Sequence, residues 1–92
     1  MLLVLDSPVV RLNRAVATAM ATDLDAGLEE LVALEADPRL AGYHLLPAAR
    51  ADLLRRRGDD EAAAAQYQRA LALARTVPER RYILARLKQL GG

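Results

Sequence analysis

Few side chains in this 92-residue chain could carry out catalysis. The sequence has one histidine, His44, one serine, Ser7, and no cysteine. A Ser/His/Asp arrangement would need Ser7, which precedes Pro8 as the expected N-cap of a helix. Without cysteine there can be no disulfide, thiolate metal site or cysteine nucleophile. The residue types therefore predict a protein that is not an enzyme, with no catalytic residue, no metal site and no cofactor.

The clustered charges suit helix ends better than a binding site. Residues 55–57 are three arginines, and residues 59–61 are three acids. Cations are favoured at the C-terminus of a helix and anions at its N-terminus, so the two runs are expected to flank the turn of a helical hairpin. Glu29 and Glu30 occupy adjacent helix positions and are expected on a solvated face. His44 is expected to be a packed or hydrogen-bonded residue at a helix start, or else a partner contact.

The net charge argues against nucleic acid as a direct partner. Thirteen basic and twelve acidic residues leave +1, although residues 1–46 carry −4 and residues 47–92 carry +5. The chain has no glycine-rich phosphate motif, and no aromatic or amide base reader is interleaved with the arginines of residues 55–57. The apolar run at residues 1–5 stops at Asp6 without preceding basic residues, so neither a signal peptide nor a membrane span is expected. We expect a cytoplasmic protein with no membrane partner.

Helices are predicted along nearly the whole chain, because β-branched residues are few and apolar residues recur at helical spacing. Two loops contain residues that are typical of the end of one helix or the start of the next. Gly58 is expected as a left-handed C-cap, and Thr76 with Glu79 forms a capping box. Pro47 is tolerated if it lies in the first turn of its helix. The expected helices cover residues 8–21, 24 to about 36, about 60–75 and about 77–90, and a further helix that ends at residue 57. This helix is expected to begin near residues 40–43, or at about 45 or 46 if Pro47 lies in its first turn.

An internal repeat appears at an offset of 36 residues. The offset aligns Ala15 with Ala51, Asp23 with Asp59, Gly27 with Ala63, and Leu31 with Tyr67. These pairs share a physical class, which predicts two stacked helical hairpins. Asp23 and Asp59 are each expected as the acidic cap that opens the second helix of a hairpin. Residues 44–74 resemble the tetratricopeptide repeat through the residues Ala51, Leu54, Gly58, Ala63, Tyr67, Ala70 and Leu71. Pro47, Arg50, Thr18 and Gly27 depart from that motif.

The fold expected from this resemblance is all-α and tetratricopeptide-like, a single domain over residues 1–92. It has about five helices: hairpin 1 at about 8–36, hairpin 2 at about 42–75, and a C-terminal capping helix at about 77–90. Ala63 and Ala70 are expected where helices cross.

A narrower resemblance covers nearly the whole chain. Residues 7–17, 40–56 and 79–84 resemble, in order and spacing, the C-terminal extension of a group of bacterial extracytoplasmic-function sigma factors of RNA polymerase. That group carries a tetratricopeptide-like domain after its two promoter-reading domains. Such domains are absent here, and residues 1–5 look like the tail of a preceding helix. Both an excised domain and a free-standing relative remain open.

The resemblance implies a regulatory, protein-binding module. Its expected partners are the promoter-reading domains of a sigma factor, RNA polymerase or a second copy of the chain, with a homodimer possible. The alternative is a stand-alone structural or dimerisation module with no direct role in transcription. An apolar stripe, Val9, Leu12, Val16 and Met20, is expected to be covered within the domain, by a preceding segment or by a partner. The candidate partner-binding residues are polar positions on the first helices of the hairpins: Asn13, Arg14, Arg50, Asp52, Arg55 and Arg56.

Overall fold

The alanine- and leucine-rich sequence folds into helices throughout the part of the chain that the structure describes. The computed structural model describes residues 8–91 and contains no strand in that range. This confirms the all-α prediction. The chain divides between Ala41 and Gly42 into two compact units, each taken separately below. Ser7, the expected first N-cap, lies outside the described residues, and α1 begins at Pro8 as expected.

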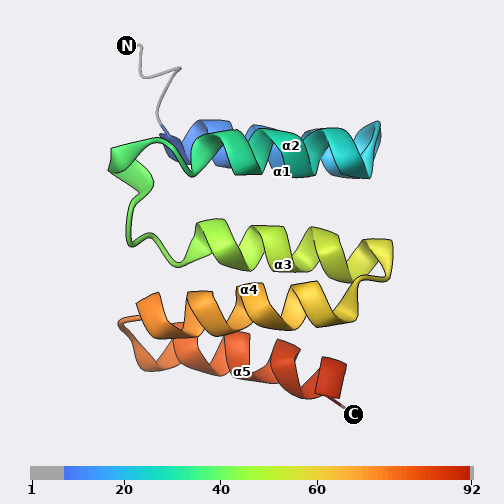
Figure 1. Ribbon diagram of the computed structural model, residues 1–92. Coiled ribbons are helices and arrows are strands. Elements are labelled where there is room, and N and C mark those ends of the chain that lie inside the picture. Colours follow the sequence, from blue (N-terminus) through green and yellow to red (C-terminus); the bar gives the residue numbers. More distant parts are fainter. Residues whose placement is uncertain (1–7, 92) are drawn as a thin grey trace. The chain divides into compact units, whose positions relative to one another are not determined.

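The first unit is a hairpin of two α-helices followed by one 3-10 turn (Figure 1). Helix α1 spans Pro8–Ala21, α2 spans Leu24–Leu34, and the 3-10 helix η1 spans Pro38–Leu40. The carboxylate of Asp23 accepts a hydrogen bond from the backbone N–H of Asp25 at 3.0 Å, so Asp23 caps α2 as predicted. The α-helix ends at Leu34, slightly earlier than expected.

Small residues bring α1 and α2 very close together. Ala15 and Ala19 are buried on α1, opposite Gly27 on α2. A Cβ atom built on Gly27 would lie 2.8 Å from the Ala15 carbonyl oxygen and 2.9 Å from the Ala19 Cα. Because no side chain fits between the two backbones at this point, only glycine allows the approach.

This close approach changes which side of α1 is buried. The buried residues are Leu12, Ala15 and Ala19, whereas Val9 is 43% and Met20 49% exposed. The described residues therefore do not cover Val9 and Met20, and coverage of these two residues by a preceding segment or by a partner stays a prediction. The contact with Gly27 selects Ala15 and Ala19 for the closest part of the interface, and of the larger apolar side chains on α1 only Leu12 is buried.

The second unit holds three helices. Helix α3 spans Leu45–Arg57, α4 spans Asp60–Leu73, and α5 spans Val77–Gly91. Helices α3 and α4 form the second hairpin, and α5 packs against α4 (Figure 1). Pro47 lies in the first turn of α3, and Gly58 ends that helix with φ of 94°, a left-handed conformation that favours glycine. The Gly58 cap was predicted from the sequence, and of the two expected starts of this helix the structure has the later one, at Leu45.

The positions related by the 36-residue offset are buried in both hairpins. In the second unit the fully buried residues include Ala51, Ala63, Tyr67, Ala70 and Ile83. In the first unit the offset counterparts of Ala51, Ala63 and Tyr67 are buried as well: Ala15, Gly27 and Leu31. The repeat seen in the sequence therefore corresponds to equivalent core positions in two helical hairpins.

The capping box before α5 is present. The Glu79 carboxylate accepts hydrogen bonds from the backbone N–H groups of Arg75 at 2.8 Å and Thr76 at 3.3 Å. In return, the backbone N–H of Glu79 donates to the Thr76 hydroxyl at 3.3 Å. The hydrogen bond from Arg75, the largest cause, holds the pKa of Glu79 below its ordinary value.

Asp59 does not cap α4 in the way that Asp23 caps α2. It occupies the N-cap position with ψ of 69°, and its side chain makes no capping hydrogen bond. The carboxylate instead accepts from Arg57, whose Nε and Nη2 atoms lie 2.9 and 2.6 Å away. The expectation of a second acidic cap was wrong in this respect, because a nearby guanidinium binds the carboxylate.

Candidate functional site

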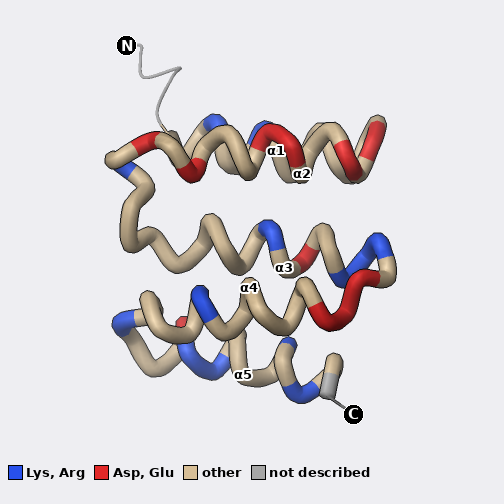
Figure 2. Tube along the Cα trace, viewed as in Figure 1, with Lys and Arg blue, Asp and Glu red and all other residues tan. Residues whose placement is uncertain are grey.

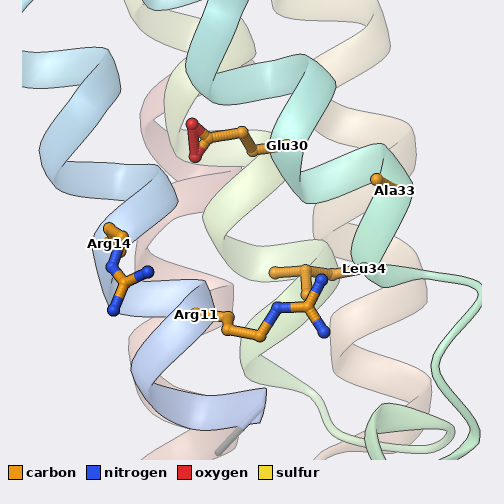
Figure 3. A pocket seen from close by; sticks show the side chains of 5 residues that line it. All are labelled: Arg11, Arg14, Glu30, Ala33 and Leu34. Carbon is orange, nitrogen blue, oxygen red and sulfur yellow. The ribbon is translucent and has the colours of Figure 1, made fainter. Parts of the chain in front are cut away.

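A pocket of about 320 Å³ opens between the two helices of the first unit. It is lined by Arg11 and Arg14 from α1 and by Glu30, Ala33 and Leu34 from α2. In Figure 3 the Arg11 side chain extends toward Leu34, and the Glu30 carboxylate points toward α1. Such a volume lies at the small end of the range for ligand pockets, so it suits one or two side chains of a partner.

The two arginines of the pocket have little charge compensation. Helix α1 contains no acidic residue, so neither arginine has an ion pair within its own helix. Arg11 approaches Asp37 only to 3.9 Å. That carboxylate is already bound by Arg39, whose Nε and Nη2 atoms lie 3.1 and 2.9 Å from its oxygens. Arg39 is also the main cause of the lowered pKa of Asp37. Arg14 forms no ion pair with any residue between 8 and 91.

The other wall of the pocket combines one charge with apolar surface. Glu30 is exposed and, within the described residues, forms no ion pair with either arginine. Leu34 is buried beneath the pocket and Ala33 is exposed at its side. The pocket therefore presents two guanidinium groups and one carboxylate around a small apolar floor. It can form charge-assisted hydrogen bonds to an anion and contact an apolar group at the same time.

The second unit contains a hydrogen-bonded network centred on Asp52. This carboxylate on α3 accepts hydrogen bonds from the hydroxyl of Tyr67 on α4 and from the hydroxyl of Tyr82 on α5, the latter at 3.3 Å. Arg55 approaches the same carboxylate at 3.5 Å. The Asp52 carboxylate thus links α3, α4 and α5 through hydrogen bonds.

The buried tyrosine of this network titrates unusually. Burial, and next the hydrogen bond to Asp52, raise the pKa of Tyr67 from 10.0 to about 12. Tyr82 is less enclosed, and the Arg86 guanidinium lies over its ring at 5.2 Å from the centroid. Tyr67 is therefore neutral at physiological pH and serves as a hydrogen-bond donor in the core.

The six candidate partner-binding residues lie in different settings. Asn13 and Arg14 are exposed on α1, and Arg14 lines the pocket. Arg56 is exposed in the last turn of α3. Arg50, Asp52 and Arg55 are half-buried on α3, and the last two belong to the Asp52 network. Within the first unit, Asn13 and Arg14 therefore remain on the surface, whereas Asp52 and Arg55 interact mainly inside the second unit.

His44 lies at the start of α3, as the sequence indicated. It occupies the N-cap position without a side-chain capping bond, and its Nδ1 atom lies 3.7 Å from Glu79 Oε1. The ring packs edge-on against Tyr43, with centroids 5.7 Å apart. The residue is thus half-buried and joins the start of α3 to the capping box.

Sequence reasoning did not single out Arg11, Glu30, Tyr67 or Tyr82 as members of a site. For the arginines a local signal existed, since Arg11 and Arg14 are three residues apart in a helix without acids. For the tyrosines none existed, because Asp52 lies 15 and 30 residues away from them along the chain.

Among residues 8–91, no group of three or more His, Cys, Asp or Glu side chains could hold a metal ion. In the same range, every helix is too short or too polar to cross a membrane. Comparisons with protein-family models, with curated proteins and with solved structures found no match for this chain.

Proposed function

We propose that this chain is a protein-interaction module built from tetratricopeptide-like hairpins, and that it regulates an extracytoplasmic-function sigma factor. The observation that carries the interaction role is the exposed apolar edge of α1. Val9, Val16 and Met20 follow one another along this edge, with Asn13 between them. Val9 and Met20 are each more than two-fifths exposed, although both are large and apolar. Apolar residues in a row at helical spacing are the usual anchor of a docking helix.

The sigma-factor role is supported by the three separated strings in residues 7–17, 40–56 and 79–84. Its mechanism is mass action. A module that binds the promoter-reading domains or RNA polymerase in one state changes the fraction of sigma factor that can initiate transcription. Such a role needs complementary surfaces and no reactive side chain. The sign of the regulation depends on which state the module binds more tightly.

The test is a binding titration with the promoter-reading domains of an extracytoplasmic-function sigma factor from the same genome. Calorimetry should show saturable binding, and Met20→Lys should weaken it at least tenfold because the new charge would enter an apolar contact. The matched control is Val77→Lys on α5 in the other unit, an apolar position that is 59% exposed against 49% for Met20. If the wild-type chain does not bind these domains or RNA polymerase, the sigma-factor role is wrong.

A structural or dimerisation module is the second candidate, and the surface of α5 favours it. Val77 is 59% and Leu84 47% exposed, and because they lie seven residues apart they share one side of α5. A second copy could cover this side. Sedimentation velocity over a wide concentration range distinguishes the two candidates. Dimerisation predicts a concentration-dependent mass that Leu84→Lys abolishes, whereas a constant monomer removes this alternative.

A further inference from the structure

We infer that the Arg11/Arg14 pocket of the first unit binds a carboxylate side chain of a partner peptide, together with an adjacent apolar side chain. This inference rests on the proposed interaction role and names the chemistry of one contact. The ligand class is an acidic peptide segment in which a glutamate lies next to a leucine-like residue.

The positions of the two arginines oppose the stability of α1. Arg11 lies at the end of the first turn, where the helix dipole disfavours a cation. Arg14 follows three residues later, so that the two like charges face the same side of the helix and repel each other. Neither effect is relieved by an acid in α1. Residues that lower the stability of their own helix are expected where a surface has a binding role.

The charged residues of the first unit direct an anion to this pocket. The chain up to Ala41 contains three arginines, and two of them line the pocket. The third, Arg39, is held by the Asp37 carboxylate. Elsewhere this unit carries mainly acids, which Figure 2 shows along α2 and the turns around it. An acidic peptide is therefore repelled by most of the unit and attracted at one place, which gives the contact a defined position.

The shape of the pocket limits the ligand to a short contact. A volume of about 320 Å³ suits side chains and is too small for a folded element. One guanidinium group can bind both oxygens of a carboxylate, and the Arg11 side chain extends toward Leu34 (Figure 3). A carboxylate bound by Arg11 therefore lies beside the apolar surface of Leu34 and Ala33, which can receive the neighbouring side chain, and Arg14 adds a second positive charge to the same pocket. Glu30 faces the same space and repels a second negative charge. The pocket should therefore prefer one carboxylate beside an apolar residue over a polyacidic run.

The experiment is an NMR titration of the full chain with two peptides. The probe is acetyl-Ala-Leu-Glu-Ala-amide, and its neutral counterpart carries glutamine in place of glutamate. The acidic peptide should shift the backbone amides around Arg11, Arg14 and Ala33, and the neutral peptide should bind at least fivefold more weakly. Raising the salt concentration should weaken binding of the acidic peptide, because the arginines are exposed.

Two variants with equal loss of charge show whether the effect is local. Arg14→Gln should weaken binding of the acidic peptide at least fivefold, and Arg81→Gln on exposed α5 should leave it within twofold. Glu30→Gln should strengthen binding, since it removes the opposing charge while keeping a hydrogen-bonding group. Arg14→Gln breaks no ion pair among the described residues and removes the repulsion with Arg11, so this variant should melt at or slightly above the wild-type temperature.

The possible results separate this inference from the proposed function. No shift near the pocket, equal binding of both peptides, or equal losses in Arg14→Gln and Arg81→Gln would each overturn the carboxylate site. If the sigma-factor domains still bind the chain in that case, the interaction role stands without this pocket. If the peptide binds as described but those domains do not, the pocket stands and the sigma-factor role fails.

Discussion

Replacing Gly27 by alanine is the most direct test of how the first hairpin is packed. At an open position inside a helix this change stabilises a protein by roughly 1 kcal/mol, because alanine is the better helix former. At Gly27 the new Cβ would lie 2.8 Å from the Ala15 oxygen, against at least 3.4 Å for an ordinary contact. The nearest atom of α1 is the Ala19 Cβ, which lies closer still, and the other two contacted atoms belong to the backbone of α1. The two helix backbones must therefore separate by at least about 0.6 Å.

The expected result is a loss of stability in spite of the better helix propensity. Overpacking typically costs about 1 to 3 kcal/mol, and separating the helices also loosens the contacts around Ala15 and Ala19. After the gain in propensity, we expect a net loss of about 1 to 2 kcal/mol. For a domain of this size, that corresponds to a fall in melting temperature of roughly 4 to 16 °C. Circular dichroism melts and urea denaturation measure it.

Two further variants separate the effect of helix propensity from the effect of the close contact. Ala33→Gly at an exposed position of α2 should lower stability by up to about 1 kcal/mol, which gives the propensity scale of this helix. Combining Ala19→Gly with Gly27→Ala removes one of the clashing groups, so the double variant should be more stable than the sum of the single effects. If Gly27→Ala raises the melting temperature, the close approach of α1 and α2 is refuted.

Three other predictions concern the second unit. Ala70→Leu, at a fully buried position of α4, should lower the free energy of unfolding in urea by about 1 to 3 kcal/mol. Ala72→Leu, on the exposed side of the same helix, should change it by less than about 0.5 kcal/mol. Equal effects of the two variants would contradict the packing of α4. Since the pKa of Tyr67 is raised from 10.0 to about 12, the stability that its neutral form contributes is complete below pH 10 and is lost as the pH rises toward 12. Tyr67→Phe should flatten the dependence of stability on pH in that window, and an unchanged slope would argue against the Asp52 network. The pKa of Glu79 is lowered by the backbone N–H of Arg75, so the stability from its carboxylate is present above the ordinary pKa of 4.5 and is lost as the pH falls through the lower, folded value. Glu79→Gln should weaken this acid dependence in urea titrations, and a wild-type pH profile would show that the capping box contributes nothing.

Local signals in the sequence predicted the helices well. Pro8, Asp23, Gly58 and the pair of Thr76 with Glu79 each act through the backbone of their own neighbourhood, so their effect can be inferred without the fold. The repeat could also be inferred without the fold, because residues 36 positions apart share a size class at the buried positions of the two hairpins. The prediction was less accurate for Asp59, because its carboxylate is bound by Arg57 and does not cap α4.

The candidate site was predicted less completely. The exposed positions of Asn13, Arg14 and Arg56 agree with the expectation of polar surface residues. For Asp52, however, the sequence suggested a surface contact, whereas the structure shows a carboxylate held by Tyr67 and Tyr82. Hydrogen bonds between residues on three helices depend on how those helices pack, and no spacing along the chain encodes that.

The sequence alone determined that this protein is helical and where most of its helices begin and end. These properties follow from the residues present and from short-range backbone preferences. Only the tertiary structure decided which face of α1 is buried. The approach of Gly27 to Ala15 and Ala19 turns the small residues inward, leaves Val9 and Met20 exposed, and places Arg11 and Arg14 beside Glu30 at one pocket. The physical reason is that helix packing depends on the closest contact between two surfaces, which a periodic pattern in one helix does not specify.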